Sequence, residues 1–396
     1  MNPEQKHKKA GWFLAGALTG AGAAALVFLL ACGKVLFGDG LLSTKTAQKL
    51  SSLQQLIGEH YYQADQVTDD QLREGVYKGL LEALDDPYSV YYTQDEVKKL
   101  NETISGTYDG IGAYVSMDTD MGCPRIAGVI AGSPAEKAGL MEGDLLWEAD
   151  GESLKGLDLD VAVSSIKGEK GTPVELTVIR DGEKLTVTVT RDEVQSETVQ
   201  GEMLEDGIGY LQIAEFDEVT PDQFIGTLES LQKEDMKGLI LDLRGNPGGT
   251  VTAVTSIAQY LVPEGLIFYM EYPDGSRKEY KADGTKYIDL PVAVLVNENS
   301  ASASEILSSA IQDSGAGTVI GTKTYGKGVV QTAYALQDGT EVKLTIAEYF
   351  TRNGSKVNKT GVTPDKEVTL DTEKYRKDGT DSQLEAAVET IKKEIK

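Results

Sequence analysis

The stretch PVAVLVNENSASASEILSSAIQD, residues 291–313, joins an apolar run to a helical pattern across a short polar turn. PVAVLV is typical of a buried strand, and the apolar residues of SEILSSAIQD recur at helical spacing. The same alternation surrounds this stretch: the other strand-like runs are IGYLQI, KGLILDL and GTVIG, and the helical runs are TPDQFIGTLESLQ and TAVTSIAQYLV. Residues 195–370 are therefore predicted to form an α/β domain with a largely parallel sheet.

Residues 106–194 have a different pattern, made mainly of short strands. VELTVIRDGEKLTVTVT contains two alternating runs about Asp181-Gly182, which is a strong hairpin signal. Two short helical runs, SPAEKAGL and LDLDVAVSSI, interrupt the strands. This pattern predicts a second compact domain, so the chain as a whole is mixed α/β. Helical spacing predicts a helical segment over residues 33–105 and a helical extension over residues 371–396.

The N-terminal region contains a long apolar run. Residues 11–32 carry no charge, and about 22 residues at about 1.5 Å each would span roughly 33 Å as a helix. Lys6, Lys8 and Lys9 precede the run, which favours a cytoplasmic tail over residues 1–10 and an extracytoplasmic remainder. The prediction is a single-pass anchor in the cell membrane. A cleaved signal peptide, or a lipoprotein signal ending at Cys32, is the alternative.

Composition excludes several kinds of protein. The formal net charge of −25 opposes nucleic-acid binding. Two cysteines, Cys32 and Cys123, are too few for a disulfide framework or a thiolate metal cluster. The two histidines, His7 and His60, precede every candidate catalytic segment, which makes a Ser-His-Asp triad and a multi-histidine zinc site improbable. A hydrolase of this sequence would need another base and is expected to use no metal or organic cofactor.

Two segments together suggest nucleophilic catalysis. Ser302 and Glu305 fit the capping box S-x-x-E, so helix capping alone explains the serine. However, Lys327 lies between Gly326 and Gly328 in an apolar setting, and a buried lysine can lose its proton and act as a base. An exposed lysine on a hairpin is the alternative interpretation.

Two glycine-containing segments could present backbone amides. In KGLILDLRGNPGGTV, residues 237–251, a strand runs into a turn whose N–H groups could stabilise an oxyanion. A phosphate-binding loop lacks its Gly-Lys-Ser/Thr here, and a plain helix-start turn remains open. In YDGIGAYV, residues 108–115, the glycines could aim N–H groups at a carboxylate, or they could form an ordinary turn.

Seven segments in the same order resemble the C-terminal processing peptidases, the tail-specific protease family. They are LDDPYSVY, YDGIGAYV, SPAEKAGL, DLRGNPGG, NENSASASEI, TYGKGVVQ and GVTPD. The resemblance covers about residues 50–370. It implies a helical N-terminal part, an inserted PDZ domain over residues 106–194, and a protease core related in shape to the crotonase and Clp-protease sheets.

The same resemblance implies roles for individual residues. Ser302 would be the nucleophile, Lys327 the base and Gln331 the support of that lysine. The oxyanion donors would be the amides of Ala303 and of Gly248, with Gly249 the alternative to Gly248. The PDZ loop Gly110, Ile111 and Gly112 would bind the substrate's C-terminal carboxylate. On an ideal strand, positions four apart lie about 13 Å apart, so contact between Lys327 and Gln331 would require a local bend.

The expected function is therefore a membrane-anchored serine endopeptidase. It would bind free apolar C-termini of proteins or peptides and cleave near them, and a homodimer is its candidate assembly. Lys167 stands where the family often has an arginine linked to gating by the PDZ domain; because lysine lacks the planar fork, that gating is not carried over to this chain. The rival functions are a PDZ scaffold with an inactive core and a crotonase-like acyl-transfer enzyme.

Overall fold

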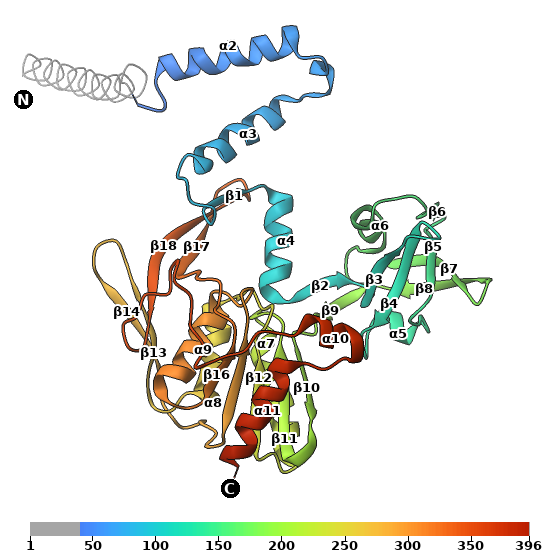
Figure 1. Cartoon of the computed structure of the whole chain (residues 1–396). Helices are drawn as coiled ribbons and strands as arrows, with labels where there is room; N and C mark the ends of the chain where they lie inside the picture. Colours follow the sequence, from blue (N-terminus) through green and yellow to red (C-terminus); the bar gives the residue numbers. More distant parts are fainter. Residues whose placement is uncertain (1–39, 396) are drawn as a thin grey trace, which may run out of the picture. The chain divides into compact units, whose positions relative to one another are not determined.

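The computed structural model describes residues 40–395 and divides the chain into two compact units, one ending at Asp85 and one beginning at Asp86 (Figure 1). The described part of the first unit is helical, with α2 (Thr44–His60), η1 (Ala64–Gln66) and α3 (Asp69–Glu82). Thr68 and Gln71 form a reciprocal capping box that fixes the start of α3. The predicted helical segment is confirmed over these residues.

The predicted membrane location requires a correction. Between residues 40 and 395, no helix combines the length and the hydropathy that crossing a bilayer requires. The predicted anchor, residues 11–32, and the tail before it lie outside the described residues. Because the structure contains no spanning helix where it is described, we withdraw the prediction of a single-pass protein with an extracytoplasmic catalytic domain.

The small β domain begins after α4 (Gln94–Ser105), which ends at Gly106 in the left-handed conformation. Its main sheet has the order β3-β4-β5-β7-β8, with β6 beside β5, and a separate ribbon pairs β2 with β9. The elements are β2 (Thr107–Gly110), β3 (Ala113–Asp118), β4 (Cys123–Val129), α5 (Pro134–Lys137), β5 (Leu145–Ala149), β6 (Glu152–Ser153), α6 (Leu159–Ile166), β7 (Pro173–Arg180), β8 (Glu183–Thr190) and β9 (Asp192–Gln195). Asp181 and Gly182, both with positive φ, form the predicted hairpin turn between β7 and β8.

The α/β core is built on a six-stranded sheet of order β10-β11-β12-β15-β16-β19, parallel except for its first pair. Its strands are β10 (Val199–Met203), β11 (Ile208–Ile213), β12 (Gly238–Asp242), β15 (Val292–Val296), β16 (Thr318–Gly321) and β19 (Lys366–Glu367). Every residue of β12 and β15 is buried. Strands covered on both faces have continuous apolar sequences, which is why these runs were recognisable.

Helices cover both faces of this sheet (Figure 1). Apolar residues of α7 (Thr220–Lys233), α8 (Val251–Leu261) and α9 (Ala303–Ser314) share one cluster with the sheet. On the other face, Ala387 and Ile391 of α11 (Ser382–Glu394) pack on Ile240 and Leu295. Full burial of each large aliphatic side chain contributes about 1.5–3 kcal/mol. The predicted mixed α/β fold is thus confirmed, and it fixes the carboxyl ends of β12 and β15 side by side.

A second sheet was not predicted from the sequence. Its order is β1-β18-β13-β14, with β17 also paired to β18. The strands are β1 (Val90–Tyr92), β13 (Gly265–Glu271), β14 (Arg277–Ala282), β17 (Val329–Ala335) and β18 (Glu341–Thr351). Outside this sheet, the short helix α10 (Thr372–Asp378) precedes α11. This sheet matters for the site because the chain enters it directly after Lys327.

Candidate functional site

Ser302 lies at the N-terminus of α9, directly after the loop that follows β15. Its φ of 54° and ψ of −111° are unusual for a residue with a side chain, and such strain costs about 1–3 kcal/mol. The Glu305 half of the predicted capping box is formed, since the Ser302 N–H donates to Glu305 Oε2 at 2.9 Å. The Glu305 N–H donates to the carbonyl of Ser302 at 2.9 Å, so this turn of the helix start closes on the Ser302 backbone.

The two neighbouring serines are structural parts of this loop. Ser300 and Ser304 are fully buried, and their hydroxyls donate to the carbonyls of Leu243 at 2.8 Å and Asn246 at 3.0 Å. Ser302, by contrast, is only partly buried. Of the three serines, Ser302 is therefore the one whose side chain can meet a ligand.

Tyr349 supports the strained backbone of Ser302 through a side-chain hydrogen bond. The buried phenol of Tyr349 donates to the carbonyl of Ser302 at 3.1 Å, and burial raises the pKa of Tyr349 well above its ordinary value. The phenol therefore stays protonated and remains a donor. This bond ties the Ser302 loop to β18.

Replacing Tyr349 by phenylalanine tests this support. Tyr349→Phe removes the donor but keeps the ring. The Ser302 carbonyl still accepts the N–H groups of Glu305 and Ile306, so the expected cost is that of one hydrogen bond, about 0.5–1.5 kcal/mol. We expect kcat to fall while KM changes little, because the loop would hold Ser302 less firmly. Urea denaturation and steady-state kinetics measure both effects; an unchanged kcat would show that this bond does not position Ser302.

Lys327 lies in the loop between β16 and β17, where the backbone of residues 358–361 packs closely. A Cβ added at Gly328 would lie 2.1 Å from the Asn358 nitrogen, and one at Gly326 would lie 3.0 Å from the Gly361 nitrogen. Gly326 also has a φ of 92°. Both flanking glycines thus leave room for the backbone of residues 358–361 to pack against the Lys327 loop.

Glu305 joins the Ser302 loop to the Lys327 loop, a role that sequence reasoning missed. Its Oε2 accepts the N–H groups of Ser302 and of Lys327, each at 2.9 Å, so these two nitrogens are no farther apart than twice 2.9 Å. Its Oε1 accepts the hydroxyl of Thr324 at 2.5 Å and the N–H of Gly326 at 2.7 Å. One fully buried carboxylate thus fixes both segments. The capping pattern identified Glu305 only as a local group.

The surroundings of Lys327 favour its neutral form. Burial lowers the pKa of Lys327 from its ordinary value, and the nearby charge of Lys343 lowers the pKa further. Asp86 and Glu305 oppose this shift. Because the net pKa shift is downward, the amine is better suited to accept a proton than an exposed lysine would be.

Gln331 lies on β17, beyond Lys327. The pairing of β17 with β18 shifts register between Val330 and Gln331, which provides a local irregularity of the kind that the expected contact would need. In the described conformation the Gln331 side chain donates to the hydroxyl of Thr345 at 3.2 Å. The side-chain bond of Gln331 in the described structure is therefore to β18 and not to Lys327.

The glycine turn after β12 lies directly against Ser302. A Cβ added at Gly248 would lie 2.8 Å from the Ser302 Cβ and 3.0 Å from the Ala303 nitrogen. The Gly248 N–H, however, donates to Asn246 Oδ1 at 2.8 Å. Gly249 forms a parallel bridge with Phe216. In this bridge the backbone of Phe216 is hydrogen-bonded to Gly248 and Thr250, which flank Gly249, so the Gly249 N–H points away from Phe216. Ala303 supplies the first amide of α9.

The expected carboxylate loop opens the small β domain. The carbonyls of Ile111 and Gly112 accept from Ala135 at 2.7 Å and Ile130 at 3.0 Å, which fixes the loop, and Gly112 has a φ of 78°. Gly110 ends β2. Lys167 lies beside this loop, since a Cβ at Gly110 would be 4.0 Å from its Cγ.

The ammonium of Lys167 has partners on two elements. It pairs with Glu102 of α4 at 3.0 Å and lies 4.8 Å from the ring centroid of Tyr108. A lysine ammonium binds a carboxylate as a point charge, without the bidentate geometry of arginine. A ligand carboxylate could therefore take the place of one of these two partners.

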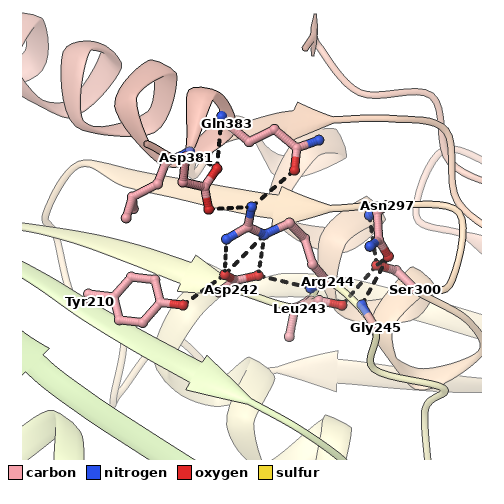
Figure 2. Close-up of polar contacts among 10 residues, drawn as sticks. Tyr210, Asp242, Leu243, Arg244, Gly245, Asn297, Ser300, Asp381 and Gln383 are labelled. Atoms are coloured by element: carbon pink, nitrogen blue, oxygen red, sulfur yellow. Dashed lines mark hydrogen bonds and ion pairs between the residues drawn. The ribbon is translucent and has the colours of Figure 1, made fainter. Parts of the chain in front are cut away.

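A polar network ties the C-terminal helix to the glycine turn (Figure 2). Arg244, just before the turn, pairs with Asp242 at 2.6 Å and with Asp381 at the start of α11 at 2.8 Å. Within the turn, the Gly245 N–H donates to Asn297 Oδ1 at 2.9 Å. The Gly245–Asn297 bond joins the β12 and β15 loops, and the Arg244 ion pairs join the β12 loop to α11.

Comparisons with known proteins agree with this architecture. Residues 207–368 match peptidase family S41, residues 125–180 match the PDZ domain, and residues 38–96 match the activating protease CtpB N-terminal domain. Among solved structures, a putative S41 protease from Bacteroides fragilis matches with a TM-score of 0.52 at 18% identity, over 80% of this chain and 90% of that one. At that identity the match shows the fold alone.

Two curated proteins of Bacillus subtilis are similar over most of the chain. Carboxy-terminal processing protease CtpA is 38% identical over 351 residues, which cover 88% of this chain and 74% of that protein. Carboxy-terminal processing protease CtpB is 36% identical over 326 residues, covering 81% of this chain and 67% of that protein.

Proposed function

The chain belongs to the carboxy-terminal processing serine proteases of peptidase family S41, with a PDZ domain, and from this premise we propose that Ser302 and Lys327 form its catalytic dyad. The observation that carries this proposal is the Glu305 carboxylate, which accepts the backbone N–H groups of both residues at 2.9 Å. Ser302 is the partly exposed serine of its loop, and Lys327 is the lysine whose pKa is lowered by burial.

In the proposed reaction, Ser302 Oγ attacks the carbonyl carbon of the scissile peptide bond while Lys327 Nζ takes the hydroxyl proton. The carbonyl oxygen becomes an oxyanion, which the amide of Ala303 and an amide of the glycine turn stabilise. Lys327 then returns the proton to the leaving amine as the C–N bond breaks, and water releases the acyl group by the reverse sequence. Gln331 supports Lys327 from β17.

The turn offers two donors for the oxyanion. Gly248 lies closer to Ser302, but its N–H would have to be shared with Asn246. The Gly249 N–H, which its bridge to Phe216 leaves on the opposite side, is the alternative. In both cases a side chain at Gly248 would clash with the Ser302 loop.

The proposed substrates are proteins or peptides with a free, apolar C-terminus. The loop Gly110, Ile111 and Gly112 would receive the terminal carboxylate, and the adjacent Lys167 would add a positive charge beside it. The possible homodimer stays a prediction, for which sedimentation analysis of the purified chain is the direct measurement.

The test uses a small folded protein with an unstructured apolar tail, made with either a free or an amidated C-terminal carboxyl group. We expect the full chain to cleave the free form about tenfold faster, since a loop aimed at a carboxylate loses a charge-assisted bond of about 1.5–3 kcal/mol with the amide. Ser302→Ala is expected to yield no product. Equal rates for the two tails would contradict PDZ capture, and wild-type cleavage by Ser302→Ala would contradict the dyad.

A further inference from the structure

The segment DPYSVY, residues 86–91, has no role in the reaction described above, yet it borders the proposed base. The ammonium nitrogen of Lys327 lies 4.8 Å from the centroid of the Tyr88 ring. The two residues are far apart in sequence and meet only because β1 joins the second sheet beside β18.

Tyr88 is held rigidly in this position. Ser89 is buried, and its hydroxyl donates to Asp86 Oδ2 at 2.6 Å while accepting the Thr345 N–H of β18 at 3.1 Å. Asp86 Oδ1 accepts the N–H of Tyr88 itself at 3.1 Å. Val90, two residues later, pairs with Lys343. The backbone that carries the Tyr88 ring is therefore fixed by a closed turn bonded to β18.

The ring meets Lys327 as a neutral aromatic face. Burial, together with Tyr325 alongside, raises the pKa of Tyr88, so its phenol keeps its proton near neutral pH. An aromatic face attracts an ammonium ion but not a neutral amine. The charged groups that act on Lys327 from the surrounding elements are Asp86, Glu305 and Lys343.

We propose that Tyr88 is a positioning residue for the dyad, which holds the Lys327 side chain and stabilises the ammonium that forms when Lys327 takes the Ser302 proton. This proposal rests on the proposed function. The charge exists only between the transfer of the proton from Ser302 Oγ and its return to the leaving amine. An interaction made only with that charged state stabilises the transition state more than the bound substrate. Loss of the ring face should therefore lower kcat and leave KM nearly unchanged.

The test compares the pH dependence of kcat/KM for the full chain and for two variants, with the free-tailed substrate protein. Tyr88→Phe keeps the ring face. It should leave the acidic limb of the profile, the pH range in which kcat/KM rises, at the same pH as in the wild type. Tyr88→Leu keeps an apolar cover without an aromatic face and should move that limb to lower pH by about 0.4–1.5 units, the size of a cation–π contact. Its kcat should fall about 2- to 30-fold, by the same range.

The outcomes separate this proposal from the dyad itself. If the limb of Tyr88→Leu coincides with that of Tyr88→Phe, Tyr88 only fills space and the proposal is wrong. Should Tyr88→Leu fail to fold, Tyr88→Trp provides the opposite shift: a stronger aromatic face must move the limb to higher pH, and an unmoved limb would overturn the proposal. Full activity of Lys327→Ala would instead overturn the proposed dyad.

Discussion

Lys327→Met is expected to lower kcat by about 10²- to 10⁴-fold, the range that a positioned general base contributes. Methionine has a similar length and fills the same space between Gly326 and Gly328, but its thioether does not take the proton from Ser302. Because Lys327 is partly buried and its charge is disfavoured there, the variant should unfold at a temperature no lower than that of the wild type. Steady-state kinetics and a thermal melt measure the two properties.

The pH dependence supplies the control for Lys327→Met. Protonated Lys327 cannot act as a base, so kcat/KM of the wild type should be low at low pH and rise as the pH passes the pKa of Lys327. Since burial and Lys343 lower that pKa, the rise should lie below 10.5, the ordinary lysine value. Lys343→Gln removes one lowering charge and should move the rise to higher pH. A Lys327→Met variant that retains the rise would show that another group is the base.

The sequence allowed the parallel core to be predicted because its strands are buried on both faces. The strand, turn and helix of residues 291–313 appear as β15, the loop containing Ser302, and α9. The hairpin at Asp181-Gly182 was equally readable, since both residues adopt the positive φ that its turn requires. In these segments local chemistry and tertiary structure favour the same conformation.

The second sheet escaped prediction because its strands are only partly covered. Most residues of β18 are half-buried, and β14 is largely exposed, so neither has a continuous or cleanly alternating apolar pattern. Register shifts within the β13–β14 and β17–β18 pairs disturb the period further. Without this sheet, the position of Tyr88 beside Lys327 could not be derived from its motif.

Sequence reasoning could nominate the candidate residues one by one, but it could not predict the hydrogen bonds that connect their segments. Ser302 and Lys327 stand in recognisable motifs, whereas the carboxylate that links their segments was identified only as a capping group. Glu305 accepts hydrogen bonds from Thr324 and Gly326, residues about 20 positions away in the sequence. Such bonds depend on how the β16–β17 loop folds over α9, and no local pattern specifies that.

Glu305→Ala is therefore expected to be among the most damaging single substitutions in the chain. It leaves four donors without their acceptor: the buried N–H of Gly326 and hydroxyl of Thr324, and the partly buried N–H groups of Ser302 and Lys327. Each buried donor without a partner costs about 1–3 kcal/mol, and local relaxation recovers part of the sum, so we expect a loss of about 3–5 kcal/mol in unfolding free energy. Urea denaturation of the purified chain measures this loss.

Two further variants separate the positioning role of Glu305 from general destabilisation. Ser309→Ala, on the same buried helix, removes a hydroxyl bonded only within α9 and should change the unfolding free energy by less than about 1.5 kcal/mol. Glu305→Gln keeps one acceptor oxygen but places an NH₂ group next to N–H donors. We expect this variant to remain folded in part of the urea range. Ser302 and Lys327 would nevertheless lose the carboxylate to which both are bonded. For that variant we expect a reduced kcat with KM nearly unchanged, because the substitution does not touch the PDZ loop that we propose binds the substrate. If folded Glu305→Gln had wild-type kcat, the shared carboxylate would be a structural bond without a part in aligning the dyad.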